Sequence, residues 1–65
     1  MKVKEVIKII EKHGWFLVSQ KGSHRQYKHS SIPGRVTIPG NLQDDLPKGT
    51  FNSVLKQAGI NKSGS

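Results

Sequence analysis

Residues 15–29 of the chain read Trp15-Phe16-Leu17-Val18-Ser19-Gln20-Lys21-Gly22-Ser23-His24-Arg25-Gln26-Tyr27-Lys28-His29. Residues 15–20 are rich in aromatic and β-branched side chains, which favours a strand. Lys21-Gly22 then predicts a short hairpin turn, and residues 23–29 predict a second strand that is mostly polar. This stretch is therefore expected to fold as an antiparallel hairpin.

Two amphipathic helices and a third strand surround the hairpin in sequence. Residues 2–13 carry apolar side chains at helical spacing, and Gly14 suits the position that follows a helix. Residues 35–39 predict the third strand, and a second helix follows, with Thr50 as its N-cap and Gly59 as its stop. The apolar stripe of the first helix consists of Val3, Val6, Ile7 and Ile10.

The element order α-β-β-β-α predicts an α+β domain in which two helices cover one face of a three-stranded antiparallel sheet. The other face is expected to stay open. Side chains alternate along a strand, and Tyr27 is the large aromatic of residues 23–29, so its side is the expected core face. His24, Gln26 and Lys28 then share the open face. The aromatic residues expected in the core are Trp15, Phe16 and Phe51.

Composition limits the class of protein. The chain has 65 residues, which suit one domain at 1–61 and a flexible tail at 62–65, and it has no cysteine for a disulfide or a thiolate metal site. No apolar run approaches the roughly 20 residues of a membrane span, and no secretory signal begins the chain, so a cytoplasmic location is expected. A net charge of +7 favours a nucleic acid or an acidic protein as partner, although it also serves plain solubility.

The segment from Lys21 to Lys28 combines groups that suit acid–base chemistry on a phosphodiester. An imidazole at His24 can accept a proton from a hydroxyl or donate one to a leaving oxygen. Neighbouring cations can bind phosphate and stabilise charge at phosphorus. The alternatives are a surface histidine that only contacts a partner, and solvated charges that protect strand edges. The cations of this cluster are Lys21, Arg25, Lys28 and Arg35.

A metal site is not expected. His24 and His29 point to opposite sides of one strand, and His13 lies in another element, where it is read, like His29, as structural. No carboxylate cluster surrounds the basic hairpin, so a two-metal mechanism is not expected. A nuclease built on these residues would work without a divalent metal, which points to RNA because its 2′-hydroxyl is an internal nucleophile. The four carboxylates are Glu5, Glu11, Asp44 and Asp45.

Residues 1 to about 61 resemble the HicA toxins of bacterial and archaeal toxin–antitoxin pairs. The resemblance is carried by the amphipathic first helix that ends in Gly14-Trp15 and by four further segments. These segments are Lys21-Gly22-Ser23-His24-Arg25-Gln26-Tyr27, Arg35-Val36-Thr37-Ile38-Pro39, Leu46-Pro47-Lys48-Gly49-Thr50-Phe51 and Leu55-Lys56-Gln57-Ala58-Gly59-Ile60.

The resemblance implies a fold like that of double-stranded-RNA-binding domains and an endoribonuclease that cleaves messenger RNA and arrests growth. It implies a single catalytic histidine at His24 and a HicB antitoxin that hides this residue. The composition of the basic hairpin itself gives no expectation of a cofactor, and the residues expected to contact RNA or its phosphates are Lys21, Gly22, Ser23, Arg25, Gln26 and Lys28.

The sequence departs from the family at one place. Many members carry a second histidine after the proline of the third strand, whereas Pro39 is followed here by Gly40 and Asn41. The second proton-transfer group therefore stays open between His29 as a substitute and three other candidates, which are Ser23, Tyr27 and Lys28. Two other functions also stay open: an RNA-binding module without catalysis, and a module whose basic face meets an acidic protein.

Overall fold

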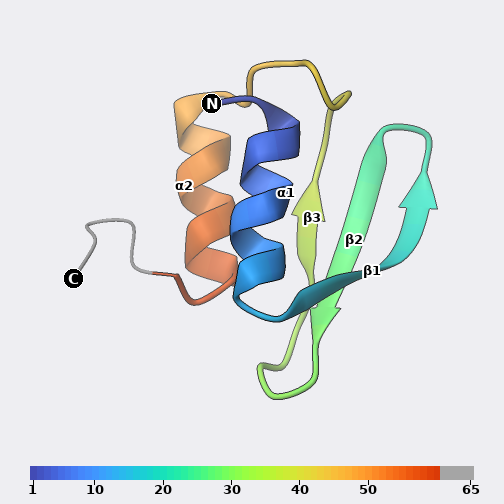
Figure 1. Cartoon of the computed structure of the whole chain (residues 1–65), viewed down its shortest axis with the longest axis vertical. Helices are drawn as coiled ribbons and strands as arrows, with labels where there is room; N and C mark the ends of the chain where they lie inside the picture. The colour runs from blue at the N-terminus through green and yellow to red at the C-terminus, as the bar shows by residue number, and fades with distance from the viewer. Residues whose placement is uncertain (61–65) are drawn as a thin grey trace.

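The predicted order α-β-β-β-α is confirmed in the computed structural model, which describes residues 1–60 (Figure 1). The strands form one antiparallel sheet in the order β1-β2-β3, so the central strand is β2. The elements are α1 (Val3–Lys12), β1 (Trp15–Lys21), β2 (His24–His29), β3 (Val36–Ile38) and α2 (Lys48–Gln57). The predicted tail at 62–65 lies outside the described residues.

The core lies between the sheet and the two helices. Trp15 at the start of β1 is buried, and its indole Nε1–H donates to the carbonyl of Ala58 at 3.2 Å, which ties the first strand to the end of α2. Tyr27 fills the middle of β2. The remaining buried apolar side chains come from both helices, from β3 and from the segment before α2: Val3, Val6, Ile7, Ile10, Val36, Ile38, Leu46, Val54, Leu55 and Ala58.

The segment between β3 and α2 closes the start of α1. The first backbone N–H groups of a helix have no partner within it. Here the N–H of Val3 donates to the carbonyl of Asp44 at 2.9 Å, and the N–H of Lys4 donates to that of Leu42 at 3.1 Å. The Glu5 carboxylate accepts from the N–H of Lys2 at 2.8 Å. A loop distant in sequence therefore fixes the entry to the first helix.

The second helix begins earlier than the sequence predicts, so the assignment of Thr50 as its N-cap is wrong. Helix α2 starts at Lys48 with Pro47 as its cap, and the N–H of Phe51 donates to the carbonyl of Pro47 at 2.8 Å. Pro47 has extended backbone, and it lacks an N–H group that would otherwise need a partner at the start of the helix. Gly49 is tolerated because it lies in the first turn, where the N–H groups have no partners within the helix. The predicted stop at Gly59 is confirmed, since its φ of +71° lets the N–H of Ile60 reach the carbonyl of Leu55 at 2.9 Å.

The placement of Phe16 in the core is also wrong. Phe16 is 49% exposed, whereas its neighbour Trp15 is 2% exposed. Consecutive strand residues point to opposite faces, and the buried positions of all three strands fit helices on one face only. One of two adjacent aromatic residues must then face solvent. None of the helices in residues 1–60 is long and apolar enough to cross a membrane.

Candidate nucleic-acid interface

A tight turn delivers His24 to the start of β2. Strand pairing continues to Lys21 opposite His24, so the turn consists of Gly22 and Ser23, one residue later than predicted. Gly22 has a φ of +60°, while within residues 1–60 no residue other than glycine has positive φ, which is the pattern of a type II′ turn with glycine at its first central position. The side-chain amide of Gln20 donates to the carbonyl of Gly22 at 3.1 Å and holds the turn. The conformation of the turn is therefore fixed, and with it the position of His24 at the start of β2.

A bulge in β1 sets which side chains accompany His24. Leu17 pairs with Tyr27, but the next paired residue is Ser19, opposite Gln26, so Val18 is the extra residue. Simple alternation from Trp15 would place Lys21 on the core face. The bulge shifts the alternation by one, and Lys21 then faces the same way as its partner His24.

The predicted division of β2 into two faces is confirmed. Tyr27 is 2% exposed on the helix side, whereas His24 and Lys28 are exposed on the other side. We call this other side the open face. Strand register places on it Phe16, Ser19, Lys21, His24, Gln26, Lys28 and Thr37.

The His24 ring is not engaged by the rest of the described fold. It is exposed, and it makes no hydrogen bond with any other residue in the described part of the chain. Lys21 lies directly across the ladder, at the separation of about 5 Å between Cα atoms that such pairs have. An imidazole with both nitrogens available and an ammonium beside it can transfer a proton and attract a phosphate.

Arg35 joins the open face from just before β3. Its guanidinium donates to the side-chain oxygen of Gln26 at 2.6 Å. Gln26 lies in the middle of β2, opposite Thr37. This bond brings a third cation toward the face that carries Lys21 and Lys28, and sequence alternation alone does not reveal it because Arg35 lies outside the strand.

Arg25 is turned to the helix side and is part-buried. Its NH1 donates to the carbonyl of Gly40 at 2.8 Å and to that of Ser23 at 3.4 Å. Arg25 thus links the hairpin to the residue that follows β3 and Pro39. The structure separates it from Lys21, Lys28 and His24, with which the sequence had grouped it.

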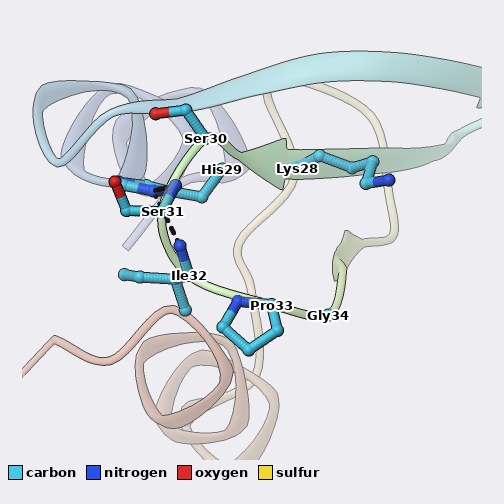
Figure 2. Close-up of a pocket in the computed structure, with 7 residues that line it drawn as sticks. All are labelled: Lys28, His29, Ser30, Ser31, Ile32, Pro33 and Gly34. Carbon is cyan, nitrogen blue, oxygen red and sulfur yellow. Dashed lines mark hydrogen bonds between the residues drawn. The ribbon is translucent and has the colours of Figure 1, made fainter.

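His29 lies at the other end of β2 and is fully engaged (Figure 2). Its Nδ1 accepts from the backbone N–H of Ser31 at 2.9 Å and of Ile32 at 3.2 Å, so Nδ1 carries no proton. Its Nε2–H then donates to the carbonyl of His13 at 2.7 Å. The ring also meets Trp15 edge-on, with centroids 5.2 Å apart. Because both of its ring nitrogens are hydrogen-bonded, His29 has no free nitrogen with which to take the place of the second histidine in proton transfer.

The other candidates for a second proton-transfer group are also placed. Tyr27 is on the buried face, where burial, and after it the charge of Glu11, raise the pKa of its hydroxyl above the ordinary value, partly offset by Arg25. Ser23 lies in the turn beside His24. Lys28 shares the open face but is four residues from His24, about 13 Å along the strand.

An open pocket of about 450 Å³ lies near His29, at the end of the sheet opposite to His24. Residues 28–34 line it, and Figure 2 shows Lys28 pointing away from the His29 ring. Within residues 1–60, no group of three His, Asp or Glu side chains gathers in a way that could hold a metal ion.

The open face, the two helices behind it and the exposed histidine after the hairpin turn define a small basic α+β domain suited to binding an anionic partner. The family described as the HicA toxin of bacterial toxin-antitoxin matches residues 3–60, nearly the whole chain. The protein therefore belongs to the HicA toxin family.

A solved structure supports the same assignment. A chain of a toxin–antitoxin complex from Streptococcus pneumoniae is 34% identical, with a TM-score of 0.74, and the match covers 92% of this chain and 98% of that chain. A comparison with curated proteins found no significant match to this chain.

Proposed function

We propose that this toxin is an endoribonuclease that cleaves messenger RNA without a metal ion, with His24 as its general acid or base. One observation carries the proposal: the His24 ring is exposed and forms no hydrogen bond within residues 1–60, opposite Lys21 on a basic sheet face. Membership of the HicA family and the likeness to a chain of a toxin–antitoxin complex support it.

The chemistry follows from the internal nucleophile of RNA. His24 accepts the proton of a ribose 2′-hydroxyl as its oxygen attacks the adjacent phosphorus. The bond from phosphorus to the 5′-oxygen breaks, the 5′-oxygen takes up a proton, and the products are a 2′,3′-cyclic phosphate and a 5′-hydroxyl. Lys21 stabilises the negative charge that grows on the phosphate oxygens. Ser23, beside His24 in the turn, is the nearest of the candidates for the second proton transfer.

The other proposed contacts divide by face. Lys28, together with the pair of Gln26 and Arg35, binds the RNA backbone farther along the open face. Gly22 and Ser23 shape the turn that presents His24. Arg25 contributes through the position of the hairpin, because its guanidinium is bound to the carbonyl of Gly40.

The proposed antagonist is an antitoxin of the HicB type that covers the open face and hides His24. The toxin is strongly basic, with a net charge of +7. An acidic antitoxin surface would therefore bind the toxin and keep RNA away from it. The likeness to a chain that was solved within a toxin–antitoxin complex supports such a partner.

The decisive experiment is RNA cleavage in excess EDTA by the wild type, His24→Ala and His13→Ala. His13 is an exposed histidine outside the open face, so its variant is the matched control. We expect wild type and His13→Ala to leave 2′,3′-cyclic phosphate ends and His24→Ala to lose at least ~100-fold in rate.

Other results would point elsewhere. Cleavage retained by His24→Ala would contradict the catalytic role. RNA bound but not cleaved by the wild type would indicate an RNA-binding module. No RNA affinity at moderate salt, together with tight binding of an acidic protein, would indicate an interaction module.

A further inference from the structure

Phe16 is an aromatic side chain on the face proposed to bind RNA. Register places Phe16 opposite Lys28, and Lys28 shares its face with Gln26 and His24. Phe16 is 49% exposed. Its ring is therefore not part of the core and is available to a ligand of this face.

The surroundings of Phe16 are basic. Lys28 lies directly across the ladder, and Arg35 reaches the same face through Gln26. An exposed aromatic ring beside cations on an open sheet is the arrangement with which proteins bind single-stranded nucleic acid, because every base can stack on a ring while cations hold the backbone. Its neighbour Leu17, 47% exposed, points to the opposite face and lacks this setting.

Distance decides which nucleotide meets the ring. Lys28 and Phe16 lie four residues along the sheet from His24, about 13 Å. A base over Phe16 therefore belongs to a nucleotide that flanks the cleaved one. It can reach the ring only if it is unpaired, since a base inside a duplex is stacked between its neighbours.

We propose that Phe16 is a base-stacking residue that holds an unpaired base of the RNA flanking the cleavage site, so that the toxin favours single-stranded segments. This inference rests on the proposed ribonuclease function and names its substrate class. Phe16 positions the substrate and takes no part in proton transfer. Stacking on a phenyl ring tolerates every base, so Phe16 selects unpaired structure rather than a particular sequence.

The first test measures RNA binding in a His24→Ala background, which prevents cleavage. The probes are a short unstructured oligoribonucleotide containing 2-aminopurine and a duplex of the same sequence. We expect Phe16→Ala to weaken binding of the single strand by roughly 5- to 100-fold and to abolish the quenching that stacking produces. Phe16→Trp is expected to retain both, and Leu17→Ala is the control, because Leu17 has nearly the same exposure on the other face. Duplex binding, which depends on phosphate contacts, is expected to change little in any variant.

The second test measures cleavage kinetics with His24 intact. We expect Phe16→Ala to raise KM for unstructured RNA and to leave kcat within about threefold, because stacking contributes uniform binding. The stacking proposal alone fails if the wild type cleaves RNA and Phe16→Ala behaves as Leu17→Ala does. It also fails if Phe16→Ala weakens only binding of the antitoxin. If the wild type neither binds nor cleaves RNA, both proposals fail.

Discussion

His24 and His29 occupy the two ends of the same strand, yet their surroundings give them opposite properties. His24 is exposed on the open face, and its ring forms no hydrogen bond within residues 1–60. His29 uses both ring nitrogens in three hydrogen bonds to backbone groups and packs edge-on against Trp15. A hypothetical Cβ at Gly14 would lie 2.7 Å from its Nε2, so even the neighbouring backbone is fitted to this ring.

The comparison shows that residue type does not decide a histidine's role. An odd spacing of five residues sends the two rings to opposite faces of the sheet. The face that carries His29 is joined to the helices and the following loop, where an unpaired polar ring would be costly. No helix or strand of residues 1–60 covers the face that carries His24, so its ring can stay free for a ligand.

The largest expected effect on stability is that of His29→Ala. The change removes the acceptor for two N–H groups, the donor to the carbonyl of His13 and the contact with Trp15. We expect the free energy of unfolding to fall by about 2–3 kcal/mol. Urea denaturation measures it, with His24→Ala, expected to change stability by less than about 0.5 kcal/mol, as the comparison.

Two further variants divide the His29 contribution. The side-chain oxygen of Asn occupies the place of Nδ1, so His29→Asn keeps an acceptor for the N–H groups of Ser31 and Ile32. The amide nitrogen of Gln reaches the place of Nε2, so His29→Gln keeps the donor to His13. Both are expected to be more stable than His29→Ala. Equal stability of the Ala variants at His24 and His29 would contradict the contrast between the two rings.

Much of this contrast could be predicted from the sequence, because regular alternation places side chains with no knowledge of tertiary contacts. The helical stripe that includes Val6 and Ile10, the buried position of Tyr27 and the exposure of His24 all follow from periodicity. The open face was expected because two single-striped helices cover only one side of a sheet. These predictions depend on local geometry that the chain specifies by itself.

The remaining features depend on how distant segments meet. The bulge at Val18 lets Trp15 face the core while Lys21 faces the open side with His24, and no residue there signals it in advance. Arg25 faces inward as alternation predicts, but its bond to Gly40 exists only once β3 is in place. The aromatic character of Phe16 favours the core, but its alternation with the buried Trp15 is the signal that places it on the exposed face.

A smaller effect on the free energy of unfolding is expected to distinguish Arg25 from Lys28, the two cations that flank Tyr27 in β2. We expect Arg25→Ala to lower the free energy of unfolding by about 1–2 kcal/mol, because its charged hydrogen bond to Gly40 is part-buried. We expect Lys28→Ala to leave stability unchanged within about 0.5 kcal/mol. Lys28→Ala should instead weaken RNA binding and reduce the dependence of log affinity on log salt by about one. Urea denaturation and RNA titration at several salt concentrations measure the two effects.

The salt dependence distinguishes the roles of these cations. In the His24→Ala background, Arg25→Ala is expected to keep the full salt slope at a temperature where it is folded. A reduced slope in both variants would mean that Arg25 leaves Gly40 and contacts phosphate when RNA binds. That result would restore Arg25 to the group of RNA-binding residues that the sequence suggests.

The smallest effect concerns the buried face at high pH. Burial raises the pKa of the Tyr27 hydroxyl above its value in the unfolded chain, and the charge of Glu11 adds to this. A raised pKa in the folded state means that the stabilising difference is complete below pH ~10 and is lost as the pH rises further, because the unfolded chain releases its proton first. The free energy of unfolding should therefore fall more steeply above pH ~10 in the wild type than in Tyr27→Phe. The chain has a single tyrosine, so ultraviolet absorbance follows this ionisation directly. Equal slopes in the two proteins would show that the hydroxyl ionises as freely in the fold as in the unfolded chain.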